Sequence, residues 1–298
     1  MQKRPRFKVF WQPRVKGKFS SVFAQPANSS LIVDQVGGVL QAAWSTRKVV
    51  SSYSGSALRV RRSSDNSELD IGFDASGNLN ATALLAHVGA NQGYVVTWYD
   101  QSGNGNNVTQ STALAQPQIV IGGSIHAING KAAILFDGLS TSLPRASATF
   151  NPYIINSVNS PSSFGAVNSI ARQLNGTSGV PWYLRLDASG QLLFVKDATG
   201  LITTSAIPLA PMVVTGVRTD GTNSNLYLNG SVPPLVSTAA PMSTSATVGN
   251  FSIGQHPGGG QNYSGYIAEV MIYSSDFTTT QRQTLERNQG TYFGITVA

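Results

Sequence analysis

The sequence predicts an all-β protein. Its 298 residues are 41% hydrophobic and only 11% charged, and 30 of them are glycine. Short apolar or alternating runs closed by Gly, Asn or Asp recur along the chain, which is typical of many short strands joined by tight turns. No repeat of fixed length is visible, which argues against a solenoid or a propeller. The length suits one large β domain.

The first half predicts a linker and then strands. Residues 20–38 form a Pro- and Gly-bounded linker, so residues 1–38 are assigned to an arm and residues 39–298 to the globular domain. One short helix is expected near 80–89, capped by Asn80 or Thr82 and ended by Gly89. The strands expected in this half cover residues 57–62, 94–99, 118–123 and 132–138.

The second half predicts hairpins and a closing helix. A long polar stretch, 138–180, supplies one strand, and 182–200 and 212–230 each read as strand, turn, strand. Two further strands flank a glycine-rich loop. In the short C-terminal helix, Thr278 and Gln281 form a capping box and Gly290 ends the helix.

The charge of the chain is concentrated at its N-terminus. The net charge is +7, and the seven basic residues of positions 1–18 account for it, because the other 13 basic residues balance 13 acidic ones. Aromatic residues are interleaved with them. Such an arm favours docking on an acidic protein surface, with binding to nucleic acid or an inert tail as less favoured alternatives. The docking residues are Lys3, Arg4, Arg6, Phe7, Lys8, Phe10, Trp11, Arg14, Lys16 and Lys18.

Several functional classes are disfavoured by composition. The chain has no cysteine, so disulfides and thiolate ligands are absent. No run approaches a membrane span, and the N-terminus lacks the apolar core of a secretory signal, so no membrane insertion is expected. The three histidines show no metal-ligand spacing, and "GGGQ" at 258–261 lacks the Lys of a phosphate-binding loop.

Two blocks carry family resemblances. "LYLNG", "FSIG" and "YSGYIAEVMIY" resemble the concanavalin A-like or laminin-G-like jelly roll over about residues 130–295. "AAWSTRKVVSSYSGSALRVRRSSDNSELDIGF" and "LLAHVGANQGYVVTWYDQSGNGNNVTQ" resemble the opening of the α-L-arabinofuranosidase B catalytic domain over about residues 40–120. The opening block is also similar to sequences of bacteriophage structural proteins. These resemblances imply a concanavalin A-like antiparallel β-sandwich with an extended N-terminal arm.

A glycosidase needs two carboxyl groups across the scissile bond. The arabinofuranosidase family uses a vicinal cysteine pair and a mid-domain glutamate, and this chain has neither. Asp137, at a strand end, and Glu269, at a structural jelly-roll position, are the candidates if the protein is an enzyme. On this basis the sequence predicts a protein that is not an enzyme.

The loop "YDQSGNGNN" allows two interpretations. Asp100, Ser102, Asn104 and Asn106 alternate, so their oxygens could converge on Ca²⁺, but no closing glutamate follows. A tight turn, in which Asp100 accepts backbone N–H groups, is the favoured interpretation, and no cofactor is predicted.

A lectin-like function would use aromatic and amide side chains at loop mouths. The candidates are Trp182, His256, Gln261, Asn262 and Tyr263, with a core position for Trp182 as the plainer alternative. The combined prediction is a bacteriophage virion structural protein that decorates the capsid or tail. Its arm would bind other virion proteins, its sandwich would bind host-surface glycans, and it would form a homo-oligomer. The alternatives are an α-L-arabinofuranosidase-like glycoside hydrolase and a free carbohydrate-binding module.

Overall fold

A computed structural model describes residues 31–164, 167–175, 179–196, 199–218, 223–238, 242 and 245–298. The basic and aromatic arm, including all of the predicted docking residues from Lys3 to Lys18, lies outside the described residues. Docking through the arm and homo-oligomer formation therefore stay predictions. None of the described helices is long and apolar enough to cross a membrane.

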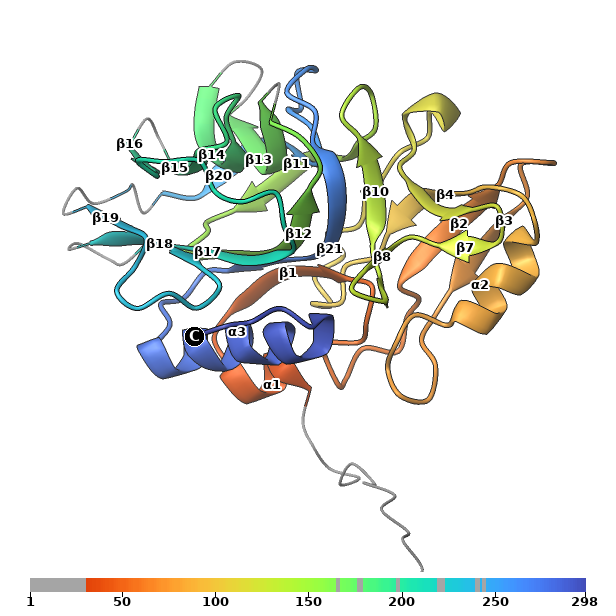
Figure 1. Cartoon of the computed structure of the whole chain (residues 1–298), viewed down its shortest axis with the longest axis horizontal. Coiled ribbons are helices and arrows are strands. Elements are labelled where there is room, and N and C mark those ends of the chain that lie inside the picture. Colours follow the sequence, from red (N-terminus) through yellow and green to blue (C-terminus); the bar gives the residue numbers. More distant parts are fainter. Residues whose placement is uncertain are drawn as a thin grey trace, which may run out of the picture.

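The predicted all-β fold is confirmed: two antiparallel sheets form a sandwich (Figure 1). The larger sheet runs in the order β19-β18-β17-β12-β21-β10-β6-β4-β2-β3, and β1, β5 and β7 pair with β21, β4 and β6. Its strands are β1 (Leu40–Ser45), β2 (Leu58–Arg62), β3 (Glu68–Ile71), β4 (Gly93–Trp98), β5 (Val108–Thr109), β6 (Gln118–Ile121), β7 (Ser124–Ile125), β10 (Ile134–Asp137), β12 (Ile154–Pro161), β17 (Met212–Arg218), β18 (Ser224–Leu228), β19 (Val236–Thr238) and β21 (Ser264–Tyr273).

The smaller sheet runs in the order β11-β20-β13-β14-β15-β16. Its strands are β11 (Leu143–Phe150), β13 (Asn168–Asn175), β14 (Gly179–Leu186), β15 (Leu192–Lys196), β16 (Thr199–Ile202) and β20 (Thr247–Ile253). A two-stranded ribbon, β8 (Ala127–Ile128) with β9 (Lys131–Ala132), and a 3₁₀ turn, η1 (Ala113–Ala115), complete the β part. The central strands of the large sheet, β12, β17 and β21, are buried on both faces, one against the small sheet and the other against helices.

The main core lies between the two sheets and is centred on aromatic side chains. Trp44 of the large sheet stacks on Phe251 of the small sheet at 5.1 Å between ring centroids. Phe150 and Trp182 pack edge-on at 6.2 Å, and all four rings are buried. Such pairs contribute beyond the apolar area that they bury.

Strand β21 joins the two halves of the chain. It pairs with β12 on one edge, and β1 and β10 share its other edge. Trp44 of β1 lies opposite Val270, and Ile134 of β10 lies opposite Ile267. Both segments with family resemblance therefore belong to one continuous sheet.

Within the described residues, three α-helices accompany the sheets: α1 (Ile32–Val36), α2 (Ala81–Val88) and α3 (Thr279–Phe293). The predicted helix near 80–89 is confirmed, with Asn80 accepting a hydrogen bond from the Ala83 N–H. The capping box of α3 is also confirmed. Gly290 does not end this helix, which continues to Phe293 because the left-handed residue at its C-terminus is Gly294.

Residues 31–38 were assigned to the linker, but α1 lies within them. Ile32, Val33 and Val36 are buried with Leu285 of α3 and Met271 of β21 in a second core. Figure 1 shows α1 lying beside α3. Three buried apolar side chains within five residues explain this packing, because they can be buried only against a neighbouring element.

Candidate functional site

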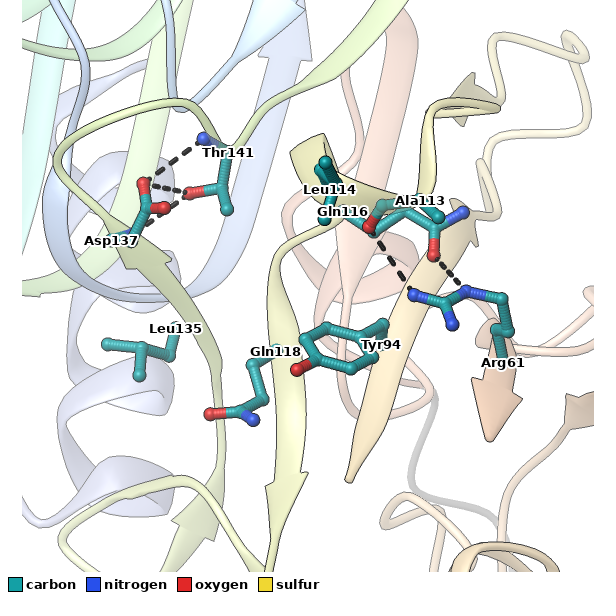
Figure 2. Close-up of a pocket in the computed structure, with 9 residues that line it drawn as sticks. All are labelled: Arg61, Tyr94, Ala113, Leu114, Gln116, Gln118, Leu135, Asp137 and Thr141. Atoms are coloured by element: carbon teal, nitrogen blue, oxygen red, sulfur yellow. Dashed lines mark hydrogen bonds between the residues drawn. The ribbon is translucent and has the colours of Figure 1, made fainter. Parts of the chain in front are cut away.

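A pocket lies on the outer face of the large sheet (Figure 2). Its floor is a row of register partners on four adjacent strands: Arg61 of β2 lies opposite Tyr94 of β4, Tyr94 opposite Gln118 of β6, and Gln118 opposite Leu135 of β10. Because side chains alternate between the faces of a strand, this row points away from the core, where Val60, Val95 and Ile134 are buried. The pocket encloses about 470 Å³, within the usual range for small-ligand sites.

One rim of the pocket is the turn after β10, where Asp137 is held by its neighbours. The backbone N–H groups of Leu139, Ser140 and Thr141 and the Thr141 hydroxyl donate to Oδ1 of Asp137 at 2.8–3.1 Å. Burial raises the pKa of Asp137, but these hydrogen bonds outweigh burial, so the pKa lies below its ordinary value. Asp137 is therefore an ionised carboxylate at neutral pH and not a proton donor.

The opposite rim is η1 with Gln116, and Arg61 at the end of the floor row is hydrogen-bonded to it. The Nε of Arg61 donates to Oε1 of Gln116 at 2.7 Å, its Nη2 donates to the Ala113 carbonyl at 3.3 Å, and its guanidinium carbon lies 4.9 Å from the centre of the Tyr94 ring. Leu114 of η1 is 91% exposed and forms the apolar edge of the pocket. The pocket thus combines one anion, one cation, amides and an apolar edge (Figure 2).

Glu269, the second carboxylate candidate, lies away from this pocket. It is fully buried and accepts hydrogen bonds from the Arg47 Nε at 2.6 Å, the Ser45 hydroxyl at 2.9 Å and the Gln289 amide at 2.9 Å. Its side chain cannot reach a substrate, because protein groups surround it. The candidate catalytic role of Glu269 is therefore wrong, and its position in the β21 pattern is structural.

The loop that contains Asp100 is hydrogen-bonded to β1. Oδ1 of Asp100 accepts from the N–H groups of Ala43 and Ser102, and Oδ2 accepts from the Ser102 hydroxyl and the Asn106 N–H, all at 2.6–2.9 Å. The side-chain amides of Asn104 and Asn106 donate to the Gln41 carbonyl. Both carboxylate oxygens of Asp100, the Ser102 hydroxyl and the NH2 groups of Asn104 and Asn106 thus form hydrogen bonds within the chain. Within the described ranges, no group of three or more His, Cys, Asp or Glu side chains could hold a metal ion.

Replacing Asp100 by alanine is expected to lower the free energy of unfolding by about 1–3 kcal/mol, because the buried N–H group of Ala43 and the part-buried N–H group of Asn106 would lose their acceptor. Urea denaturation, with the exposed Asp276→Ala as control, measures the loss. EDTA and added Ca²⁺ are expected to leave the Tm of the parent unchanged. A calcium-dependent rise in Tm that Asp100→Ala abolishes would restore the metal interpretation.

The predicted glycan-binding residues separate into two groups. Trp182 and Tyr263 have no exposed surface: the Trp182 indole donates to Gln173 at 2.7 Å, and the Tyr263 hydroxyl donates to Asn159 at 2.9 Å. A sugar-binding role for these two is wrong, because their rings fill the core. His256, Gln261 and Asn262 are partly exposed on the loop between β20 and β21.

Two family models match the chain and confirm both resemblances. Residues 32–138 match the catalytic domain of α-L-arabinofuranosidase B, and residues 142–281 match the concanavalin A-like lectin/glucanases superfamily. A probable α-L-arabinofuranosidase B of Aspergillus fumigatus is 36% identical over 110 residues, which cover 33% of this chain and 22% of that protein.

Solved structures share the fold over most of the chain. A mutant GH54 α-L-arabinofuranosidase soaked with 4-nitrophenyl α-L-arabinofuranoside superposes with a TM-score of 0.69 at 16% identity. An arabinofuranosidase complexed with arabinofuranosyl-α-1,2-xylobiose gives 0.66, also at 16% identity. Each match covers 86% of this chain and 63% of the other. The chain therefore spans less than two thirds of these relatives.

These findings correct the functional prediction. A bacteriophage virion structural protein, located in the virion and without enzymatic activity, is contradicted, because the curated relative and the structures with the same fold are α-L-arabinofuranosidases. The missing cysteine pair and mid-domain glutamate were the reason for expecting no enzymatic activity. The alternative of a glycoside hydrolase is the better supported one.

Sequence reasoning found Asp137 but missed the rest of the pocket. Arg61, Tyr94, Gln118 and Leu135 come from strands up to 74 residues apart, and each alone reads as an ordinary outward residue. Alternation along each strand identifies the outward positions. Only the pairing register between strands brings these four together.

Proposed function

We propose that the protein is a glycoside hydrolase that acts on α-L-arabinofuranosides, with the Asp137 pocket as its sugar site. One observation carries the proposal: every residue that lines the pocket, except Thr141, lies within the segment that matches the α-L-arabinofuranosidase B catalytic domain. The pocket volume of about 470 Å³ suits one or two sugar units.

The chemistry assigned to Asp137 follows from its charge. Hydrolysis of a glycosidic bond passes through a transition state with oxocarbenium character. An ionised carboxylate beside the sugar ring stabilises that positive charge or activates the attacking water. Tyr94 and Leu114 provide apolar surface for the sugar, and the Gln118 amide provides hydrogen bonds for its hydroxyl groups.

In the part that the structure describes, the pocket offers no carboxyl group suited to protonate the leaving group, and this should limit the rate of hydrolysis. Asp137 is the single carboxylate among the described residues that line the pocket, and its pKa is lowered, so it is not suited to protonate the departing oxygen. We infer a steep dependence on leaving-group acidity. Turnover of 4-nitrophenyl α-L-arabinofuranoside is expected to exceed that of the methyl glycoside by at least about 100-fold, the usual minimum contribution of a general acid.

Replacing Asp137 by asparagine is expected to lower kcat/KM for the aryl arabinofuranoside by at least about 100-fold, because the charge is lost while the side-chain volume is kept. Release of 4-nitrophenol measures the rate. Asp187→Asn is the matched control, since Asp187 also accepts backbone N–H bonds, from Ser189 and Gln191, in a turn of the other sheet. Absent turnover by the parent, or equal rates for the two variants, would overturn the proposal.

A further inference from the structure

Two arginines lie side by side on the outer face of the small sheet. Arg172 of β13 pairs in register with Tyr183 of β14, and Arg185 follows on the same face of β14. The Nη1 atoms of Arg172 and Arg185 both donate to Oε1 of Gln261, at 2.7 and 3.3 Å. Their guanidinium carbons lie 5.0 and 4.5 Å from the centre of the Tyr183 ring.

The charges of Arg172 and Arg185 are not matched by a carboxylate. Within the described part of the chain, neither arginine forms an ion pair, whereas the buried Arg47 and Arg282 pair with Glu269 and Glu286. Arg172 is only 6% exposed. Burial and the nearby charge of Arg185 lower the pKa of Arg172. Two adjacent cations that are largely shielded from solvent repel each other, and a bound anion would relieve this repulsion.

Each arginine also has an unused donor. The Nε atoms of Arg172 and Arg185 are buried and have no hydrogen-bond partner. A buried donor without an acceptor costs free energy. A guanidinium can use Nε and one Nη together to hold both oxygens of a carboxylate. The unsatisfied atoms are therefore of the kind that a planar anion satisfies.

The surroundings of the two arginines suit a sugar. His256 lies near enough to Arg172 and Arg185 for their charges to lower its pKa, after the larger effect of burial. Its Nδ1 accepts the Gly258 N–H at 2.8 Å, so the neutral ring carries its proton on Nε2 as a donor. Tyr183 contributes the aromatic ring that both guanidiniums contact. Because the Gln261 oxygen accepts from both arginines, its NH2 group is the part that can donate to a sugar. These are the groups that orient sugar hydroxyls.

We propose that Arg172 and Arg185 bind the carboxylate of an acidic sugar, a hexuronate, with Tyr183, His256 and Gln261 contacting its ring and hydroxyl groups. The site is separate from the Asp137 pocket and does not depend on hydrolysis. One loop borders both, because Gln261 contacts the arginines and the Asn262 amide donates to the Leu139 carbonyl beside Asp137.

The test is a titration of the full chain with glucuronate and galacturonate, in which NMR or calorimetry measures the affinity. The neutral sugars glucose and galactose are titrated in the same way for comparison. At least one uronate is expected to bind at least tenfold more tightly than its neutral counterpart. Arg185→Gln is expected to weaken uronate binding at least tenfold, and Arg172→Gln more strongly. Asp137→Asn is expected to leave it unchanged, which separates this site from the proposed hydrolytic one.

The controls address folding and charge. Arg287→Gln removes an exposed arginine of α3 and is expected to bind uronate like the parent. Because Arg172 is buried, the binding of Arg172→Gln is compared only if its Tm stays near that of the parent. If its Tm falls, the half-buried Arg185→Gln alone tests the proposal. Equal binding of acidic and neutral sugars, equal binding of inorganic phosphate and uronate, or a loss in Arg287→Gln equal to that in Arg185→Gln would overturn the proposal.

Discussion

Replacing Glu269 by alanine is expected to lower the free energy of unfolding by about 3–5 kcal/mol, because it would leave the Arg47 charge buried without its partner. The loss extends beyond the ion pair. The Ser45 hydroxyl would also lose its acceptor. The Gln289 amide, which connects α3 to β21, would lose one of its two acceptors and keep the other, Asn156. Urea denaturation at neutral pH measures the difference.

Two further variants show whether the loss comes from the unpaired charge. Glu68→Ala removes an exposed glutamate of β3 and is expected to change stability by less than about 0.5 kcal/mol. The double variant Arg47→Met with Glu269→Met is expected to be more stable than Glu269→Ala, since apolar side chains of similar length avoid an unpaired buried charge. A loss below about 1 kcal/mol in Glu269→Ala would contradict the structural role.

Replacing Trp182 by alanine is expected to cost about 3–5 kcal/mol of stability. Its ring is fully buried against Phe150 and Phe251, at 6.2 and 5.6 Å between centroids. The buried Oε1 of Gln173 would also lose the hydrogen bond from the indole. Denaturation followed by near-ultraviolet circular dichroism reports the loss of this aromatic cluster directly.

The conservative variant Trp182→Phe distinguishes core packing from sugar binding. It is expected to keep most of the stability, because a smaller aromatic ring fills most of the space, and to leave binding of sugars unchanged. A Trp182→Ala variant that unfolds like the parent but loses sugar binding would show that the indole contacts a ligand. In that case the core assignment of Trp182 would be wrong.

Local signals predicted much of the fold correctly. Asn80 and Thr278 cap helices as expected, because capping depends on residues within one turn. The turn at Asp100 was also the favoured interpretation of its loop, because an aspartate after a strand satisfies nearby backbone N–H groups. The expected end of α3 at Gly290 was wrong, because a glycine ends a helix in this way where its backbone becomes left-handed. In α3 that residue is Gly294.

The chain by itself determined its all-β class, several of its strands and turns and the isolated candidate Asp137, because alternation, capping and turn chemistry act over a few residues. The single strand expected in residues 138–180 was wrong: β11, β12 and β13 all lie there, and buried polar residues such as Asn156 and Asn159 of β12 conceal the apolar pattern of a strand. Only the tertiary structure decided which outward side chains meet. The row from Arg61 to Leu135 depends on the register of four strands, and the meeting of Arg172, Arg185 and Gln261 depends on a loop that crosses between strands. Register is fixed by burying one face of a whole sheet, a property that no short stretch of sequence contains.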